Sequence, residues 1–231
     1  MEIYGNRKMN FTKDMDYNEL LNKKMLQFIT NGESVDEIVS QVEQSLKGGC
    51  RWIQIRMKDF SDTDIESVLR KAVPLCRQHR AVCIMNDRVD MAKLHGMDGV
   101  HLGAEDMSVA EARDILGPDA LIGVTANTIE QILELSQQSM SYFGIGPMRY
   151  TTTKKNLAPF IGLSGYHDIV DAMRQLEVTK PAVAIGGIRL TDVYDLLDAG
   201  LWGVAVSGAI ADSGDIKGST EKFMKIINGF E

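Results

Sequence analysis

The chain has 231 residues, 44% of them hydrophobic, and a formal net charge of −7 at pH 7. This length and apolar content suffice for one large core and fit a single α/β barrel. The acidic excess, with no basic block against it, argues against nucleic acid or an anionic membrane as a partner. No apolar run approaches the roughly 20 residues that span a bilayer, and no apolar signal core follows the N-terminal charges, so we expect a cytoplasmic protein.

Residues 1–24 are polar, rich in Met, Asn and Lys, and lie outside the pattern that follows them. We expect them to be an N-terminal extension. It either forms a short helix near residues 16–24 against the bottom of the fold or is partly disordered.

From about residue 26 onward, short β-branched runs alternate with amphipathic stretches, which is the pattern of βα units in a parallel sheet. Helices are predicted between the strands, for example at 62–80 and 128–138, and a last helix at 219–228. Eight βα units predict a (β/α)8 TIM barrel in one domain, residues 25–231. The predicted strands are 26–30, 52–56, 82–85, 99–102, 121–125, 142–145, 182–185 and 203–206.

The three cysteines, Cys50, Cys76 and Cys83, form no CxxC pair and cannot all be paired with one another. A disulfide framework or a cysteine metal cluster is therefore not expected. We predict three buried, reduced thiols.

The second strand carries two cations near its carboxyl end, the face where barrels place their active sites. Gln54, Arg56 and Lys58 share one parity, so they project to one side while the apolar residues between them face the other. Buried cations are costly unless an anion meets them. The pattern predicts an anion site, and the alternative is salt bridges to neighbouring carboxylates.

Two carboxylates, Asp87 and Asp106, follow the third and fourth predicted strands. They can converge at a separation that one Mg²⁺ would bridge, since this ion prefers a few carboxylates plus water and substrate phosphates. Each residue taken alone is as typical of a helix N-cap. Glu105 is a weaker candidate for the same site. Arg88 is expected to tie its loop together through a nearby carboxylate or backbone carbonyls.

A histidine in the fourth strand, His101, invites a catalytic interpretation because histidine titrates near neutrality. It lies mid-strand between two apolar residues. We therefore expect a core histidine whose hydrogen bonds are satisfied, or one that supports a site residue.

The last two strands are followed by small residues, Gly186-Gly187 and Ser207-Gly208. This matches the phosphate site of many barrels, in which loop amides and a short helix bind a monophosphate. One such pair alone usually marks a turn, whereas two pairs on adjacent strands favour a phosphate site. The segment 145–156, which follows the sixth strand, is rich in hydroxyls and cations. It is either a polar flap over a phosphorylated ligand or a solvated surface loop.

In order and spacing these motifs resemble those of the thiamine phosphate synthase family, over roughly residues 26–223. The motifs are QIRMK at 54–58, MNDR at 85–88, GVHLGAED at 99–106, AIGGI at 184–188, GVAVSGAI at 203–210 and the segment 145–156. The resemblance implies Mg²⁺ on Asp87 and Asp106. It implies a catalytic or charge-neutralising group formed by Lys154, Lys58, Arg56 and Thr125. It implies substrate contacts from Gln54, Arg56, Lys58, Asn86, Thr125, Thr151, Thr153, Lys154, Gly186, Gly187, Val206 and Ser207.

The chain also departs from the family pattern. Thr125 stands where Ser is usual and keeps the hydroxyl, and Asn127 stands where His is usual. Arg149-Tyr150 replaces an aromatic–Pro pair before the flap threonines. We expect this change to add a positive charge at the substrate mouth.

The implied activity is a transferase reaction of thiamine biosynthesis. The diphosphate of 4-amino-5-hydroxymethyl-2-methylpyrimidine would condense with 4-methyl-5-(2-phosphoethyl)thiazole, or its carboxylated form, to give thiamine phosphate and pyrophosphate. Two phosphate regions on one rim fit such a reaction. The alternatives are a thiazole tautomerase-like relative and a noncatalytic phosphate-ligand sensor. Retention of Lys58, Asn86, Asp87, Asp106 and Lys154 argues against the tautomerase. The sequence leaves open whether the chain forms a homo-oligomer.

Overall fold

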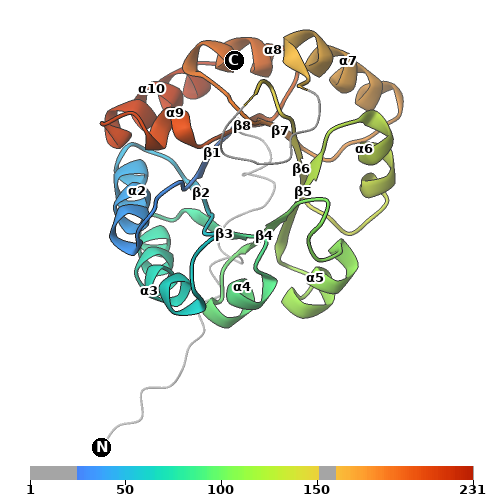
Figure 1. Cartoon of the computed structure of the whole chain (residues 1–231). Coiled ribbons are helices and arrows are strands. Elements are labelled where there is room, and N and C mark those ends of the chain that lie inside the picture. Colours follow the sequence, from blue (N-terminus) through green and yellow to red (C-terminus); the bar gives the residue numbers. More distant parts are fainter. Residues whose placement is uncertain (1–24, 151–159, 231) are drawn as a thin grey trace, which may run out of the picture.

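The protein is a closed barrel of parallel strands, seen in a computed structural model that describes residues 25–150 and 160–230 (Figure 1). Each strand pairs with the next along the chain, and the eighth pairs with the first. The predicted (β/α)8 barrel is confirmed. The strands are β1 (Met25–Ile29), β2 (Trp52–Ile55), β3 (Val82–Asn86), β4 (Gly99–Leu102), β5 (Leu121–Ala126), β6 (Tyr142–Ile145), β7 (Ala182–Ile185) and β8 (Gly203–Val206).

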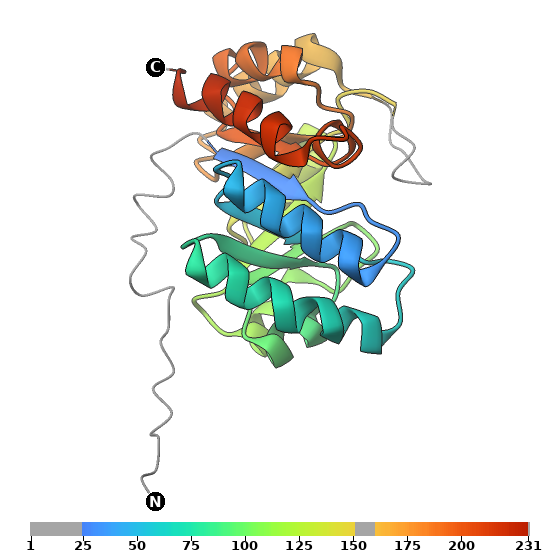
Figure 2. The same cartoon turned by 90° about the vertical axis from the view of Figure 1, so that its left-hand side faces the viewer.

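Helices surround the barrel and run back along its outside (Figures 1 and 2). Four of them begin at a Ser or Thr cap whose side chain accepts a hydrogen bond from the amide three residues later, which satisfies an otherwise unpaired donor. The helices are α2 (Val35–Lys47), α3 (Asp62–Gln78), α4 (Val89–His95), α5 (Val109–Leu116), α6 (Ile129–Ser136), α7 (Gly162–Gln175), α8 (Val193–Asp198) after the 3₁₀ turn η2 (Leu190–Asp192), α9 (Gly208–Ala211) and α10 (Ile216–Asn228).

The predicted strands agree with the observed ones to within one residue at each end. The predicted helices differ more at their ends. Helix α10 begins three residues before the predicted start at 219, because the Asp215 carboxylate accepts a hydrogen bond from the Gly218 amide and caps the helix there. Helix α3 ends two residues before the predicted end at 80, since Arg80 has a φ of 52°, which no α-helix accommodates.

Strand side chains alternate between two apolar layers. The outward set, such as Ile53 and Ile55, packs against the helices, and the inward set fills the barrel. Inside, the Trp52 and Tyr142 rings meet edge to face with centroids 4.7 Å apart. A Cβ at Gly123 would lie 2.1 Å from Cζ of Tyr142, so glycine makes room for this ring. The barrel is thus a packed core, and only its rim is open to ligands.

The remaining sequence expectations about the fold concern thiols and the membrane. Cys50, Cys76 and Cys83 are all buried and none is in a disulfide, as predicted. Burial raises the pKa of the Cys50 thiol and so favours its protonated form.

Within residues 25–150 and 160–230, no helix has the length and apolar character required to cross a membrane. The predicted extension 1–24 lies outside the described residues.

Candidate functional site

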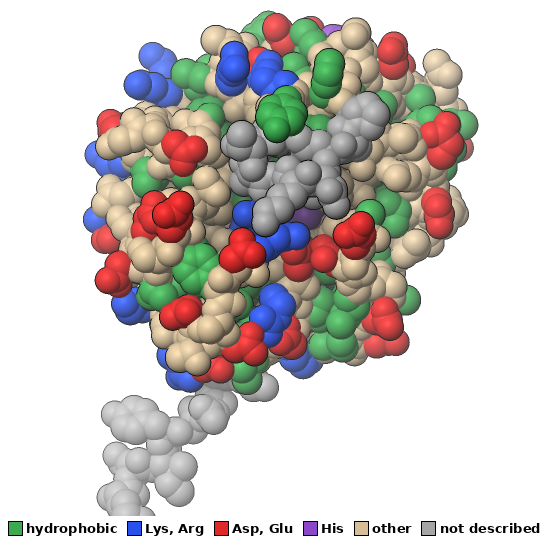
Figure 3. All heavy atoms as spheres, viewed as in Figure 1, with side chains coloured by type: hydrophobic (Ala, Val, Ile, Leu, Met, Phe, Trp, Pro, Cys, Tyr) green, Lys and Arg blue, Asp and Glu red, His purple; other side chains and the backbone are tan. Residues whose placement is uncertain are grey.

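The candidate residues gather on the rim formed by the carboxyl ends of the strands. Figure 3 looks onto this rim, where basic and acidic side chains lie close together near the centre of the face. At the rim, Lys58 Nζ lies 2.9 Å from Asp87 Oδ2. Since these residues follow β2 and β3, the pairing of neighbouring strands brings them together. Thr151, Thr153 and Lys154 lie outside the described residues.

The predicted parity of the β2 segment is confirmed. Gln54 points into the barrel and is 1% exposed, whereas Ile55 and Met57 belong to the outer apolar layer. The strand itself ends at Ile55. Lys58 makes one of the salt bridges that the sequence left as the alternative to an anion site, and its side chain is still 44% exposed. The ammonium group is therefore accessible to a ligand at the rim.

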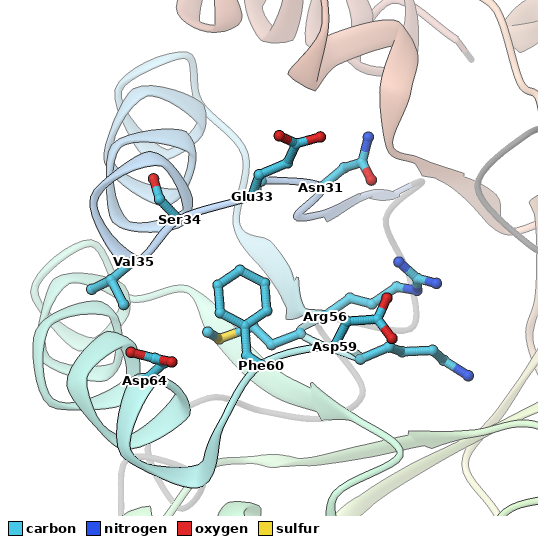
Figure 4. Close-up of a pocket in the computed structure, with 11 residues that line it drawn as sticks. Asn31, Glu33, Ser34, Val35, Arg56, Asp59, Phe60 and Asp64 are labelled. Carbon is cyan, nitrogen blue, oxygen red and sulfur yellow. The ribbon is translucent and has the colours of Figure 1, made fainter.

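A cavity of about 610 Å³ opens beside Arg56 and Lys58, between the β1–α2 and β2–α3 loops (Figure 4). Arg56 and Asp59 extend from the β2–α3 loop toward the mouth of the barrel, whereas Phe60 lies on the side toward the helices. The sequence analysis missed the contribution of the β1–α2 loop to this cavity. Its signal was the polar turn at residues 31–34, directly after the first strand.

Asp87 and Asp106 interact, as the sequence predicted. Burial and the Asp106 carboxyl together raise the pKa of Asp87 to about 6, while Lys58 opposes the rise. Asp106 is held in place by the Gly103 amide, which donates to its Oδ2 over 2.6 Å. Asp87 has a φ of 63°, in the left-handed region that Asp and Asn tolerate better than other side chains. Two carboxyl groups thus share a partly buried place in which two negative charges are costly.

The alternative roles for these carboxylates are excluded. The N-cap of α4 is Arg88, which makes no side-chain capping bond, and that of α5 is Ser108. Neither Asp87 nor Asp106 therefore caps a helix. The weaker candidate Glu105 is exposed.

Arg88 ties its loop together, as expected. Its guanidinium binds both carboxylate oxygens of Asp90, at 2.9 and 2.6 Å, and also Asp62 at 2.7 Å. The contact with Asp62 was not predicted, since the two residues are 26 positions apart.

A chain of buried hydrogen bonds crosses the barrel beneath the rim. The Gln54 amide donates to Gln27 Oε1 at 3.0 Å, and Gln27 donates to the Tyr142 hydroxyl at 2.9 Å. His101 lies 2.9 Å from that hydroxyl through Nδ1 and 3.0 Å from Thr125 Oγ1 through Nε2. His101 is thus a core histidine that supports a site residue, in line with the sequence prediction.

His101 bridges the hydroxyls of Tyr142 and Thr125 through its two ring nitrogens, so the positions of both side chains are linked. In a neutral imidazole one ring nitrogen donates and the other accepts.

The glycine pair after β7 has the backbone conformation that a phosphate loop needs. Gly186 and Gly187 have φ values of 86° and 72°, which other L-residues rarely adopt. On the adjacent strand, the Ser207 hydroxyl is buried and has no hydrogen-bond partner within the described residues. An unpaired buried hydroxyl fits a site that a ligand completes. The Val206 side chain packs in the outer layer, so any substrate contact is left to its backbone.

The residues that depart from the family pattern have structural partners. Arg149 binds both carboxylate oxygens of Asp192, at 2.5 and 2.9 Å, and also the Gly187 carbonyl at 2.5 Å. The expectation of an extra positive charge at the substrate mouth is therefore corrected, because the Asp192 carboxylate neutralises the charge of Arg149. Asn127 donates from its side chain to the Gly146 carbonyl and so joins the ends of β5 and β6.

The fold places these groups on the carboxyl-end rim, the face on which enzymes with a (β/α)8 barrel carry their active sites. Residues 26–210 match the family model described as thiamine monophosphate synthase, and the chain belongs to that family. The resemblance drawn from the motifs is confirmed, and with it the class, a transferase of thiamine biosynthesis.

Individual relatives agree with the family assignment. A thiamine-phosphate synthase of Bacteroides fragilis is 42% identical over 201 residues, covering 87% of this chain and 98% of the relative. One of Flavobacterium psychrophilum is 42% identical over 188 residues, covering 81% and 91%. Among solved structures, a thiamine phosphate pyrophosphorylase from Pyrococcus furiosus has a TM-score of 0.79 and 32% identity, covering 90% of this chain and 98% of its own.

Proposed function

We propose that the chain joins 4-amino-5-hydroxymethyl-2-methylpyrimidine diphosphate to 4-methyl-5-(2-phosphoethyl)thiazole, or to its carboxylated form with loss of CO₂, and releases thiamine phosphate and pyrophosphate in the cytoplasm. The observation that carries the proposal is the arrangement of one rim. A Lys58–Asp87–Asp106 cluster lies at the ends of β2 to β4, and a glycine pair with an unpaired serine hydroxyl lies at the ends of β7 and β8. The first suits a diphosphate and the second a monophosphate.

Asp87 and Asp106 would hold Mg²⁺. The raised pKa of Asp87 supports this assignment, because it reflects the cost of two like charges in a partly buried place. A hard divalent cation relieves that cost and prefers carboxylate ligands together with substrate phosphates. When bound, Mg²⁺ would supply positive charge for the diphosphate.

The protein's own residues bind, orient and stabilise charge. The C–O bond from the electron-rich aminopyrimidine to the diphosphate ionises, the electron pair leaves with pyrophosphate, and the thiazole nitrogen captures the resulting cation. Lys58, Arg56 and Lys154 stabilise the negative charge that develops on pyrophosphate. Gln54 and Thr125, fixed by the buried hydrogen-bond chain, orient the pyrimidine between them. Gly186, Gly187 and Ser207 hold the thiazole phosphate, and Asn86 contacts the diphosphate. No covalent nucleophile is required.

A pyrophosphate-release assay with both substrates and Mg²⁺ tests the proposal. We expect release that depends on both substrates and stops on chelation of the metal. Conversion of the thiazole without pyrophosphate release would instead identify a tautomerase. Binding of either ligand without turnover would identify a sensor.

The monophosphate site is predicted to be separable from the diphosphate site. In Gly187→Ala the new Cβ would lie 2.6 Å from Arg149 Cγ, at a φ of 72° that alanine rarely adopts. We expect the affinity for thiazole phosphate to fall roughly 10-fold, the scale of losing one hydrogen bond to a charged group, while pyrimidine diphosphate binds as before. Calorimetry with each ligand alone measures both affinities.

Gly96→Ala is the matched control for this prediction. Gly96 has a φ of 59° and lies at the end of α4, on the opposite side of the barrel. Its new Cβ would make only an ordinary contact, 3.5 Å from Arg77 Nη2. Both variants carry backbone strain, so a loss of thiazole phosphate affinity in Gly96→Ala of equal size would remove Gly187 from the site.

A further inference from the structure

The glycine pair after β7 is held by the segment that follows β6. The Gly186 carbonyl accepts hydrogen bonds from the backbone amides of Met148, at 3.0 Å, and Arg149, at 3.3 Å. The Gly187 carbonyl accepts one from the Arg149 guanidinium at 2.5 Å. Both glycine carbonyls therefore point toward residues 148 and 149.

This orientation determines where the next two amides point. In a trans peptide the carbonyl of one residue and the N–H of the next point in opposite directions. The N–H groups of Gly187 and Ile188 accordingly point away from residues 148 and 149. Neither has a hydrogen-bond acceptor within residues 25–150 and 160–230. Successive backbone N–H groups without acceptors form a concave place that suits an anion.

One ion pair holds this segment from both sides. Arg149 binds both carboxylate oxygens of Asp192, and Asp192 Oδ2 also accepts a hydrogen bond from the Arg189 amide at 2.7 Å. Arg149 thus binds the Gly187 carbonyl, which precedes Ile188, and Asp192 binds the Arg189 amide, which follows it. The two side chains are only 30% and 12% exposed. A bidentate contact of this kind is directional, which a single lysine cannot reproduce.

The pair also matters for charge. Burial by itself raises the pKa of Asp192, but the Arg149 guanidinium and the Arg189 amide outweigh it and hold the pKa below its ordinary value. Asp192 is therefore a carboxylate. Without Arg149 the carboxylate would lose its ion-pair partner beside the glycine pair, and its negative charge would repel a phosphate.

We propose that Arg149 and Asp192 are positioning residues for the monophosphate substrate. Their ion pair turns the amides of Gly187 and Ile188 toward the phosphate, and Arg149 cancels the charge of the carboxylate that holds the loop. The inference rests on the proposed function, which assigns the thiazole phosphate to the glycine pair. It adds Asp192, which lies outside the family motifs, and Arg149, which departs from the family pattern within the segment 145–156.

Calorimetry with thiazole phosphate, and KM values for both substrates, test the proposal. We expect Arg149→Met to weaken thiazole phosphate binding by roughly 10- to 100-fold, the scale of hydrogen bonds to charged groups, and to raise KM for that substrate alone. Adding Asp192→Asn to Arg149→Met should recover part of the loss, because the unpaired carboxylate is gone. Wild-type affinity in Arg149→Met, or an equal rise in both KM values, would overturn the proposal.

Two further variants keep the test decisive. Arg149→Lys preserves the charge but loses the bidentate contact, so we expect a several-fold loss; wild-type affinity here overturns the proposal even if Arg149→Met does not fold. Arg88→Met is the matched control, since Arg88 binds Asp90 in the same bidentate way and is 34% exposed. It should leave thiazole phosphate affinity within two-fold. If wild-type protein fails to bind thiazole phosphate, the proposed function fails instead.

Discussion

We expect Asp87→Asn to reduce kcat/KM by about 10³-fold and yet to stabilise the metal-free fold. Turnover should fall because the variant removes one of two carboxylates for Mg²⁺, whose charge stabilisation is the largest contribution available to this reaction. Asparagine has the size of aspartate and tolerates the φ of 63° at this position, so the backbone is not strained. A loss of activity is therefore attributable to charge.

The stability change follows from the sign of the pKa shift. Burial and Asp106 raise the pKa of Asp87 from 3.8 to about 6 in the folded chain, so the charged form is disfavoured there. The free energy of unfolding should consequently fall as the pH rises from about 4 to about 6. Asp87→Asn removes this penalty, and at pH 8 without metal it should gain up to about 3 kcal/mol. Denaturant titration at pH 8 and at pH 4 measures the difference, which should vanish at pH 4.

Asp90→Asn is the control, three residues along the same chain segment. Hydrogen bonds from Arg88 hold the pKa of Asp90 below its usual value, so its contribution to stability is present at neutral pH and is lost in acid. This variant should be slightly less stable than wild type at pH 8, the opposite sign, with kcat/KM within a few-fold. Equal activity losses in the two variants would contradict the assignment of Asp87.

The second large effect is expected at Lys154, in the segment after β6. Its positive charge directly follows the three threonines at 151–153, and we expect it to lie against pyrophosphate as the C–O bond breaks. Lys154→Ala should lower kcat by roughly 10²- to 10³-fold, the scale of losing one preorganised electrostatic donor, with a smaller change in substrate affinity. Single-turnover measurements separate the two quantities.

Lys155→Ala is the control for our alignment of the motif in the segment 145–156. We expect its kcat to remain within a few-fold of that of the wild type. If Lys155→Ala lowers kcat strongly and Lys154→Ala only slightly, our alignment of the motif is wrong by one residue. If neither variant loses activity, the segment is not catalytic.

Much of the site was predictable because its residues sit at fixed offsets from strand ends. The parity of Gln54 and Lys58 follows from the two-residue repeat of a strand, and it holds although the strand ends at Ile55. The proximity of Asp87 and Asp106 follows from the adjacency of β3 and β4 in a parallel barrel. These arguments need only strand order, which a run of βα units specifies.

Contacts between segments that lie far apart in the sequence could not be predicted from strand order and strand periodicity. Arg149 and Asp192 are 43 positions apart, and the sequence indicated only an extra charge at the mouth. The buried chain from Gln54 to Thr125 joins side chains of five different strands, and the sequence did not indicate that these side chains contact one another. Local periodicity specifies which face of a strand a side chain occupies, and therefore the barrel and its active rim. Which side chains meet across that barrel depends on closure of the sheet and on the fit of rings and amides inside it, and these are properties of the packed molecule as a whole.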